Sequence, residues 1–555
     1  MIGRALPVLE ISLPPAGSGM AAPEPADARL GEFRPESRAL PSFYVWTLGC
    51  QMNRSDSEEM AGRLLAAGCA EAPAMDAADL IVINTCAIRE TAEAKVVGRQ
   101  GQLAALKSTN ASLRVVLTGC AVREMDRGRL AKRFPAVDLF LRPDEEPELV
   151  DRLGLASAQG PVGIPVSGPA SVAVPAMGSI GATTVVNRTT VGVADALAST
   201  RADAVHGGAI RRSSEVSAWL PIIYGCDKTC TYCIVPFSRG PERSRPFDEI
   251  VAEARALAGQ GYREVTLLGQ NVNSYGHDLA PEPRFGHVET ERWAGRQLEL
   301  GSRPDLAELI RAIDGLRAAD GAPAIPRLRF ITSHPWDLSD RLIEAMAACP
   351  SVCEALHLPV QSGDDAVLRR MGRQYSVASY RERLDRIREA VPGIAISTDV
   401  IVGFCGETEA QYESTLRLLE AVRYDQVFAA AYSERPGTPA TRLADDVPPD
   451  VKRRRLNELL ALQEPVGLER NRAWIGRTTE VLLDTIVPPR THDHDPDEPA
   501  PTSVPVGQGS EVVHLSGRTR QNKLVHVEGP AAWVGRLVDV RIEHAGPYSL
   551  RGAIS

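Results

Sequence analysis

The stretch that decides the fold reads YGCDKTCTYCIVPFSRG and spans residues 224–240. It carries Cys226, Cys230 and Cys233, spaced C-x3-C-x2-C on one short segment. Thiols grouped this closely are typical of metal ligands or catalytic groups, because cysteines that only fill a core are rarely clustered. The segment therefore predicts a metal centre.

The number of thiols helps to separate the metals. A structural zinc ion needs four closed ligands, commonly supplied as paired C-x2-C units, and the next cysteines, Cys349 and Cys353, lie far along the chain near a predicted helix end. Iron–sulfur clusters are also held by cysteine thiolates, usually four. Three thiolates would leave one iron open to a substrate. We therefore expect an iron–sulfur cluster with one open iron; zinc, or thiols that serve packing or redox chemistry, are the alternatives.

The composition limits the class of protein. The chain has 555 residues, 44% hydrophobic and 24% charged, as in a globular protein of several domains. We expect no membrane span, because no apolar run reaches about 18 residues, and no secretory signal, because the N-terminal segment lacks a basic start and an apolar core. The formal net charge of −9 argues against non-specific coating of nucleic acid. Ten cysteines are too few for a disulfide scaffold, so we expect reduced thiols and a cytoplasmic protein.

Residues 214–473 repeat a strand-then-helix pattern. The strand segments are LPIIYG (220–225), EVTLLGQ (264–270), RLRFITS (327–333), EALHLPV (354–360), AISTDVIVG (395–403) and QVFAAAYS (426–433). Helical spacing of apolar residues follows these segments, which predicts a full or partial β/α barrel. The active site of such a barrel lies at the carboxyl ends of its strands. Polar residues at or just beyond these ends are Gln270, Asn271, Ser333, His334, Gln361, Ser362, Asp399 and Glu407.

Residues 41–154 alternate in the same way and predict a parallel α/β sheet. Its strands, FYVWTLG, DLIVINT and LRVVLTG, lead into Cys50, Cys86 and Cys120 respectively. Parallel strands end at a common sheet edge, where ligands bind. We therefore expect these thiols, distant in sequence, to converge; the alternative is three small buried core residues.

Residues 474–555 contain alternating β-branched runs such as TTEVLLDTIV (478–487), which predict a small β barrel. Two groups of cations are candidate RNA contacts: Arg239, Arg243 and Arg245 after the cysteine loop, and Arg518, Arg520 and Lys523 in this C-terminal region. Clustered cations hold phosphates. Plain surface charge and a solvated hairpin tip are the alternatives.

Four other segments lack a clear pattern. Residues 1–40 are rich in Pro, Ala and Gly and predict a disordered leader. Residues 155–213 predict a linker, and residues 489–511 a surface loop within the C-terminal barrel. The roles of these segments, and of residues 277–303, are not readable from sequence.

The cysteine loop CDKTCTYC on the first strand of a β/α barrel resembles the radical S-adenosylmethionine (SAM) superfamily. The resemblance implies a [4Fe-4S] cluster on Cys226, Cys230 and Cys233 whose open iron binds SAM, and whose electron cleaves SAM to a radical that abstracts hydrogen from an unreactive C–H bond. It also implies SAM contacts at the carboxyl ends of the barrel strands. The candidates are Tyr232, Gln270, Asn271, Gln361, Ser362, Asp399 and Glu407, and Tyr232 has simple packing as its alternative.

The order of motifs along the whole chain resembles the methylthiotransferase family of radical SAM enzymes. The motifs are LGCQMN, NTCAIRE, TGCAVRE, CTYCIVPFSRGPERSRP, LHLPVQSG, STDVIVGFCGETE and YSERPGTPA. The family implies a second, auxiliary [4Fe-4S] cluster on Cys50, Cys86 and Cys120, and a C-terminal TRAM domain that binds RNA. Cys405 departs from the family, which has proline at this position of GFCGE; we interpret it as a packing residue.

The motif GCQMN resembles the family branch that modifies adenosine 37 of tRNA. This implies insertion of a methylthio group at C2 of N6-(dimethylallyl)adenosine, with two SAM molecules per turnover. The implied partners are the anticodon stem-loop of tRNA and an electron donor such as flavodoxin or ferredoxin, and we expect a monomer. The alternatives are a methylthiotransferase for threonylcarbamoyl-adenosine tRNA or a ribosomal protein, and a non-catalytic RNA-binding iron–sulfur sensor.

Overall fold

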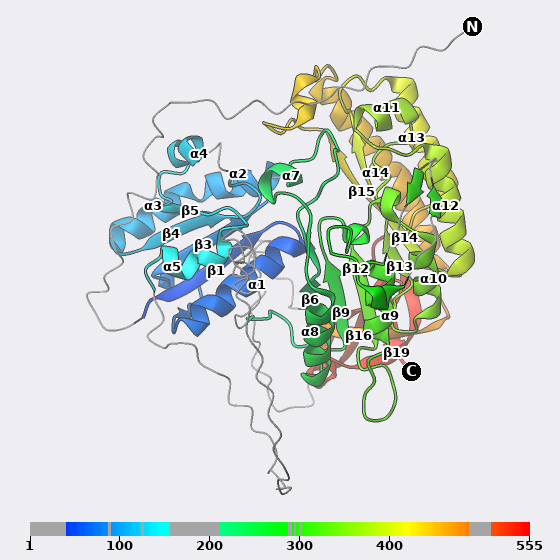
Figure 1. Cartoon of the computed structure of the whole chain (residues 1–555), viewed down its shortest axis with the longest axis horizontal. Helices are drawn as coiled ribbons and strands as arrows, with labels where there is room; N and C mark the ends of the chain where they lie inside the picture. The colour runs from blue at the N-terminus through cyan, green and yellow to red at the C-terminus, as the bar shows by residue number, and fades with distance from the viewer. Residues whose placement is uncertain are drawn as a thin grey trace, which may run out of the picture.

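The computed structural model describes residues 40–86, 90–123, 127–155, 210–286, 291–293, 296–298, 302–487 and 512–555. These residues form a parallel α/β sheet, a central β/α barrel and a small closed β barrel (Figure 1). The predicted fold class is confirmed. Nearly all of the predicted leader and linker, and the 489–511 loop, lie outside the described residues. Within the described ranges, no helix has the length and apolar character needed to cross a membrane.

The N-terminal sheet has the strand order β2-β1-β3-β4-β5, and its pairs are all parallel. The strands are β1 (Ser42–Leu48), β2 (Ala70–Glu71), β3 (Leu80–Thr85), β4 (Arg114–Thr118) and β5 (Leu139–Phe140). The helices are α1 (Gln51–Ala66), α2 (Glu90–Gly98), α3 (Gln100–Thr109), α4 (Arg127–Arg133) and α5 (Leu149–Arg152). Every residue of β3 is buried, because Ile81 and Ile83 enter one hydrophobic cluster and Leu80 and Val82 enter another. A central strand covered on both faces therefore reads as a continuous apolar run.

Six parallel strands form the central barrel in chain order. They are β6 (Ser217–Pro221), β9 (Glu264–Leu268), β12 (Arg327–Ile331), β13 (Ala355–His357), β14 (Ala395–Val402) and β15 (Gln426–Ala431). The main covering helices are α8 (Phe247–Gly259), α9 (Leu306–Asp314), α10 (Asp340–Ala348), α12 (Val377–Ala390), α13 (Glu409–Val422) and α14 (Pro449–Arg472). β6, β9 and β12 make one ladder, β13, β14 and β15 make another, and β6 and β15 are the outer edges. The barrel is therefore partial.

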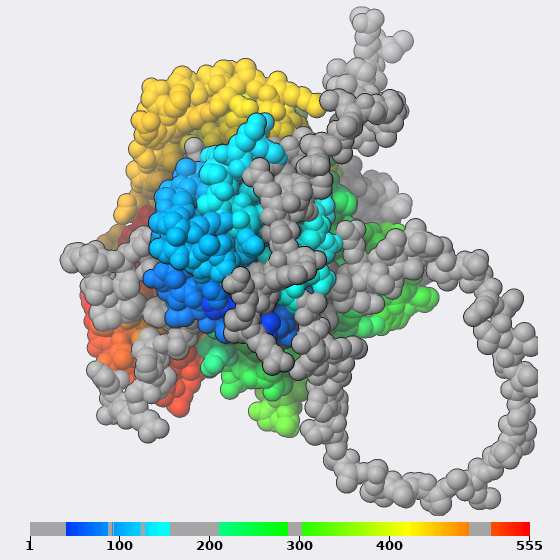
Figure 2. Space-filling model, turned by 90° about the vertical axis from the view of Figure 1, so that its left-hand side faces the viewer, coloured from blue at the N-terminus to red at the C-terminus, as the bar shows by residue number. Residues whose placement is uncertain are grey.

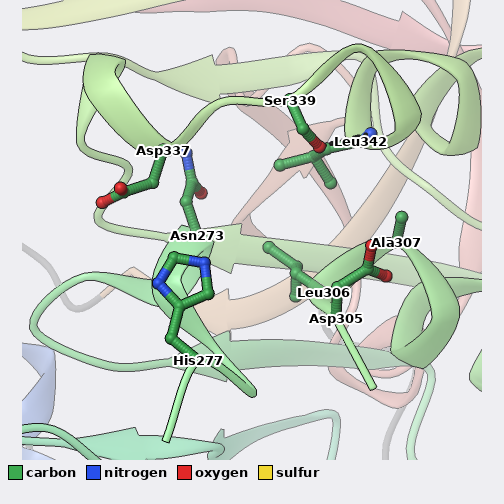
Figure 3. A pocket seen from close by; sticks show the side chains of 8 residues that line it. All are labelled: Asn273, His277, Asp305, Leu306, Ala307, Asp337, Ser339 and Leu342. Atoms are coloured by element: carbon green, nitrogen blue, oxygen red, sulfur yellow. Dashed lines mark hydrogen bonds between the residues drawn. The ribbon is translucent and has the colours of Figure 1, made fainter. Parts of the chain in front are cut away.

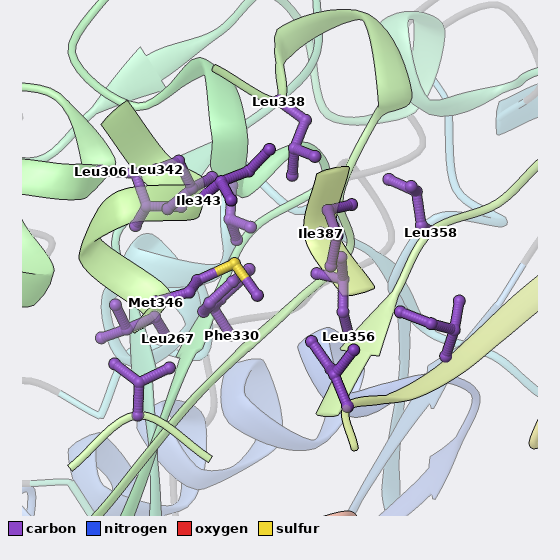
Figure 4. Packing of buried hydrophobic residues seen from close by; sticks show 14 of the residues in the cluster. Leu267, Leu306, Phe330, Leu338, Leu342, Ile343, Met346, Leu356, Leu358 and Ile387 are labelled. Carbon is purple, nitrogen blue, oxygen red and sulfur yellow. The ribbon is translucent and has the colours of Figure 1, made fainter. Parts of the chain in front are cut away.

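The two faces of the barrel strands have different chemistry. Leu267, Phe330 and Leu356 point outward and pack with helix residues such as Met346 and Ile387 in the largest hydrophobic cluster (Figure 4). Side chains alternate along a strand, so the intervening residues face the barrel interior. The interior residues include Glu264, Thr266, Arg329, His357, Ser397, Asp399 and Phe428. The interior thus carries polar groups that a closed apolar core would not contain.

The C-terminal barrel is closed, with the order β16-β17-β18-β20-β19. Its strands are β16 (Thr478–Ile486), β17 (Val512–Thr519), β18 (Leu524–Pro530), β19 (Leu537–Ala545) and β20 (Leu550–Ile554). Viewed from the side of the N-terminal sheet, this barrel lies at the lower left, away from the yellow part of the central domain (Figure 2). It is joined to the central domain through the tip of the β17–β18 hairpin.

The cations predicted to contact RNA in this region have partners inside the protein at the hairpin tip. Arg520 binds both carboxylate oxygens of Glu354 through Nε at 3.0 Å, and Lys523 Nζ lies 2.8 Å from an Asp425 carboxylate oxygen. The Arg518 carbonyl accepts a hydrogen bond from Arg327 at 2.6 Å. Glu354 and Asp425 immediately precede β13 and β15, so the tip docks on the amino ends of the barrel strands. Arg520 and Lys523 are thus paired with acidic residues of the central barrel, whereas the Arg518 guanidinium donates to the Asn522 carbonyl within the hairpin at 3.1 Å.

Candidate active site

The first cysteine triad lies at the carboxyl edge of the N-terminal sheet. β1, β3 and β4 are adjacent, with Leu48 paired to Thr85 and Asn84 paired to Thr118, so the residues that follow them share one edge. Cys50, Cys86 and Cys120 are these following residues. The structure therefore brings the three thiols together.

The environment of Cys120 shows how close the thiols are. Burial raises the pKa of the Cys120 thiol to about 12, and Cys86 and Cys50 raise it further through their charges, while Arg239 opposes the rise. A metal binds the thiolate, so cluster assembly here must displace a proton. Cys50 in turn contacts Asn53 at 3.2 Å, and Asn53 donates to Asn84 at 2.7 Å. This buried amide pair supports the triad, and we did not predict it from sequence.

Gly119 explains why the motif before Cys120 reads TGC. Its φ is +93°, and an added Cβ would stand 2.3 Å from the carbonyl oxygen of Thr85. Only glycine tolerates this conformation and this close approach. Gly225 has the same role before Cys226, since its φ is +73° and an added Cβ would meet the Pro241 carbonyl oxygen at 2.0 Å. Both triads thus depend on a glycine that lets two backbones touch.

The second triad lies on the loop that follows β7 (Ile223–Tyr224). The loop is closed by backbone hydrogen bonds from Cys226 to the Gly240 carbonyl at 3.2 Å and from Cys233 to the Cys230 carbonyl at 3.0 Å. Burial raises the pKa of Cys226 to about 12 and that of Cys233 to about 11, and the neighbouring thiols of the triad add to both shifts. The three thiols are therefore close together.

Two side chains that sequence analysis did not single out as ligand contacts lie beside Cys230. Arg373 Nη1 donates to Cys230 Sγ at 3.6 Å, and His334 Nε2 lies 4.0 Å from the same sulfur. The Arg373 guanidinium also lies 6.0 Å from the ring centre of Tyr232 and 5.7 Å from that of Tyr375. This arrangement places a buried cation and an aromatic ring next to the thiol. No strand-end pattern marks Arg373, because it follows a short helix, α11 (Asp365–Arg370).

Arg239 connects the two triads. It follows α7 (Val235–Ser238), which lies between the N-terminal sheet and the barrel in Figure 1. Its Nε donates to Cys120 Sγ at 3.1 Å, and its Nη2 lies 2.5 Å from Asp56 Oδ2. A second contact between the domains runs from Arg123 to the Pro436 carbonyl at 2.6 Å. The two triads therefore sit on adjoining faces of two domains.

The strand-end residues predicted to contact SAM have different surroundings. Tyr232 packs edge-to-face on Phe404, with ring centres 6.4 Å apart. Gln270 keeps Oε1 buried without a hydrogen-bond partner among the residues that the structure describes. Gln361 has a φ of +72° and is held to β14 through its backbone, and Asp399 Oδ2 lies 3.2 Å from His357 Nε2 on the interior face. Asp399 thus lies on the interior face of the barrel, and the other three lie on loops beyond the strands.

Three other candidates already have partners in the protein. Asn271 donates to Asp337 at 2.6 Å and accepts from the His334 amide at 3.2 Å, and the buried Ser362 Oγ accepts from the Asp364 amide at 3.3 Å. The Glu407 carboxylate accepts hydrogen bonds from the Gly403 amide and from Arg455 at 3.0 Å. These bonds show a structural use of each side chain, which residue type and strand position did not reveal.

The arginines after the cysteine loop are also mostly internal. Arg245 donates to the Pro221 carbonyl at 2.8 Å and pairs with Glu253 at 2.9 Å. Arg239 and Arg245 are buried, and Arg243 is exposed. Of the six cations predicted to contact RNA, Arg243 is the one whose side chain is exposed.

A small hollow borders the anchor of the cysteine loop (Figure 3). Its lining comes from the segment after β9, the start of α9 and the 3-10 turn Pro335–Asp337 with α10: Asn273, His277, Asp305, Leu306, Ala307, Asp337, Ser339 and Leu342. Asp337 also pairs with Lys228 of the cysteine loop at 2.7 Å. One residue of its lining thus contacts the cysteine loop, and none of the six thiols lines the hollow.

The donor atoms fit iron–sulfur clusters. All six thiols are free cysteines, grouped three and three. Within the described residues, no three or more His, Cys, Asp or Glu side chains, the thiols of each triad included, are grouped closely enough to hold a single metal ion. Cys405 belongs to a separate hydrophobic cluster with Phe404 and Tyr432.

Comparison with protein families matches the three structural units in order. The Uncharacterized protein family UPF0004 matches residues 42–142, the Radical SAM superfamily residues 220–419 and the TRAM domain residues 509–554. Together with the barrel and its cysteine loop, these matches define a radical SAM enzyme, which uses SAM and [4Fe-4S] clusters.

Similar proteins cover almost the whole chain. A tRNA-2-methylthio-N(6)-dimethylallyladenosine synthase from Carboxydothermus hydrogenoformans is 38% identical over 518 residues, which cover 93% of this chain and 100% of the relative. Proteins of the same name from Roseiflexus sp. and Clostridium botulinum are 37% and 36% identical, covering 96% and 93% of this chain and 93% and 97% of the relatives. The chain belongs to the tRNA-2-methylthio-N(6)-dimethylallyladenosine synthase family.

Solved structures are more distant. The radical SAM methyltransferase TsrM from Kitasatospora setae, bound to tryptophan and a SAM analog, has a TM-score of 0.47 and 14% identity, covering 77% of this chain and 90% of that chain. The cobalamin-dependent SAM radical enzyme OxsB has a TM-score of 0.40 and 11% identity, covering 76% and 56%. These likenesses are too low to bear on function.

Proposed function

We propose that this chain inserts a methylthio group at C2 of N6-(dimethylallyl)adenosine 37 in tRNA. The observation that carries the proposal is the pair of cysteine triads on adjoining domain faces, linked by Arg239. Sulfur insertion needs a sulfur carrier and a hydrogen-abstracting centre at the same substrate atom. Two triads on adjoining domain faces would bring these two functions together.

We assign the two triads to two [4Fe-4S] clusters. Cys226, Cys230 and Cys233 hold the SAM-binding cluster, and the triad formed by Cys50, Cys86 and Cys120 holds the auxiliary cluster. When bound, the SAM-binding cluster and SAM supply radical chemistry to a C2–H bond that acid–base catalysis cannot break at neutral pH. We propose the matching domain division: residues 41–154 carry the auxiliary cluster, residues 214–473 carry the SAM-binding cluster, and residues 474–555 form the TRAM domain.

The chain's own residues orient SAM. Arg373 places a buried cation beside Cys230, where it would neutralise the carboxylate of SAM. Tyr232 lines the same space, and Gln270 offers an unpaired buried acceptor at the end of β9. We propose SAM contacts at these three residues.

The RNA approaches from the exposed surface beside α7. Phe237 of α7 is 53% exposed, close in sequence to both Cys233 and Arg239, and Arg243 is exposed nearby. Unpaired bases in RNA loops stack on aromatic side chains, and arginines bind their phosphates. The target base must leave its stack to present C2. We propose this surface and the C-terminal TRAM barrel as the tRNA contacts, a flavodoxin or ferredoxin as electron donor, and a cytoplasmic monomer.

Mass spectrometry of tRNA nucleosides tests the proposal. A strain that lacks the gene should lose 2-methylthio-N6-(dimethylallyl)adenosine and accumulate the unthiolated nucleoside. Wild type and Cys349→Ala, a buried cysteine outside both triads, should restore the product, and Cys226→Ala should not. An unchanged nucleoside profile in the deletion strain would refute the proposed substrate assignment. Loss of a methylthio-threonylcarbamoyl nucleoside would favour the sister substrate, and failure of the reduced protein to form 5′-deoxyadenosine from SAM would favour a sensor.

A further inference from the structure

The contact of Arg239 with Cys120 has a consequence beyond linking the two triads. Its side chain is 4% exposed, and its backbone is held in the turn after Cys233 by a hydrogen bond to the Val235 carbonyl at 2.8 Å. The side chain leaves this turn, crosses the domain boundary and donates from Nε to Cys120 Sγ at 3.1 Å. A residue of the SAM-binding loop thus touches a sulfur ligand of the other cluster.

The geometry of the guanidinium makes this contact directional. Nε binds Cys120 while Nη2 of the same planar group lies 2.5 Å from Asp56. Asp56 belongs to α1, whose first residue follows Cys50. A planar fork held at two points has little freedom to rotate. The contact therefore fixes both the direction of the hydrogen bond and the position of the loop relative to the auxiliary triad.

We propose that Arg239 is a positioning residue that ties the Cys120 ligand to the SAM-binding loop and raises the reduction potential of the auxiliary cluster. This inference rests on the cluster assignment of the proposed function. Hydrogen bonds to ligand sulfurs stabilise the more negative, reduced state of an iron–sulfur cluster and so raise its potential. The positive charge of the guanidinium acts in the same direction.

Arg245 is the matched control. It is as buried as Arg239, lies on the same segment and pairs with Glu253 at 2.9 Å. The hydrogen bonds of its guanidinium go to the Pro221 carbonyl and Glu253 rather than to a thiol. A change at Arg245 therefore disturbs a buried ion pair without removing a donor from the cluster.

The test is an EPR-monitored redox titration of the auxiliary cluster in full-length protein reconstituted without oxygen. A background of Cys226→Ala, Cys230→Ala and Cys233→Ala leaves the auxiliary cluster as the only signal. In this background Arg239→Gln should lower the midpoint potential relative to the parent, and Arg239→Lys should lower it less, because the ammonium keeps the charge but cannot form the same fork. Arg245→Lys should leave the potential unchanged.

Iron content and unfolding midpoints accompany each titration. If Arg239→Gln does not load the cluster, Arg239→Lys decides the outcome, since it retains the ion pair with Asp56. A loaded Arg239→Lys protein, or a loaded Arg239→Gln protein, with the parental potential would overturn the inference. Absence of the auxiliary cluster from the parent would instead overturn the cluster assignment of the proposed function.

Discussion

Replacing Glu407 with glutamine separates a structural role from a role in SAM binding. Glu407 and Arg455 have side chains that are 1% and 4% exposed and lie 3.0 Å apart. Removing one partner of a buried ion pair costs about 3–5 kcal/mol, because the other charge stays buried without compensation. Arg455 would keep the Glu407 carbonyl and Glu409 as partners, so we expect the lower end, about 3 kcal/mol.

The assay is chemical denaturation of the anaerobic, cluster-loaded protein, with SAM affinity measured on the same samples. Glu409→Gln is the control, since Glu409 binds the same Arg455 but is 49% exposed and should cost at most about 1 kcal/mol. We expect Glu407→Gln to lower the free energy of unfolding and to leave the SAM dissociation constant unchanged. An unchanged free energy of unfolding with weaker SAM binding would refute this reasoning and restore Glu407 as a SAM contact.

Three further predictions concern the clusters and the domain interface. The intact protein should contain about eight irons, and conversion of either triad to alanine should leave about half; zinc in place of iron would contradict the assignment. Gly119→Ala should abolish loading of the auxiliary cluster and spare the SAM-binding cluster, because the new Cβ would lie 2.3 Å from the Thr85 carbonyl oxygen. Iron content and EPR spectra measure the loading of each cluster. Gly128→Ala is the control, since a Cβ there meets nothing within 4 Å. Lys523→Met should break the buried pair with Asp425 and loosen the C-terminal barrel, seen as faster proteolysis between the domains, whereas the salt dependence of tRNA binding should not change. A lower salt dependence would return Lys523 to the RNA interface.

The elements of the barrel were readable from sequence because each is a local pattern. The six apolar strand segments depend on neighbouring residues and on the side-chain periodicity of a strand. Convergence of the first triad also followed from local information, since parallel strands end at one edge. The strands and the convergence of the first triad could therefore be predicted, because the pattern that indicates each strand extends over only a few residues.

The partners of charged residues were not readable. Arg520 and Lys523 look like phosphate ligands by composition, yet Glu354 and Asp425, which neutralise them, lie far away in sequence. The same reason explains Glu407, whose partner Arg455 comes from α14, and Arg373, which reaches Cys230 from beyond α11. The role of a charged side chain depends on which opposite charge lies nearest to it in the folded protein.

By itself, the sequence determined the ligand type, the spacing of each cysteine triad and the strand ends on which the triads stand, because thiol chemistry and strand periodicity are properties of short segments. Only the tertiary structure decided that Arg239 joins the triads and that the hairpin cations hold the C-terminal barrel. Those contacts arise where separate domains meet, and complementarity across such a boundary depends on the packing of the whole chain.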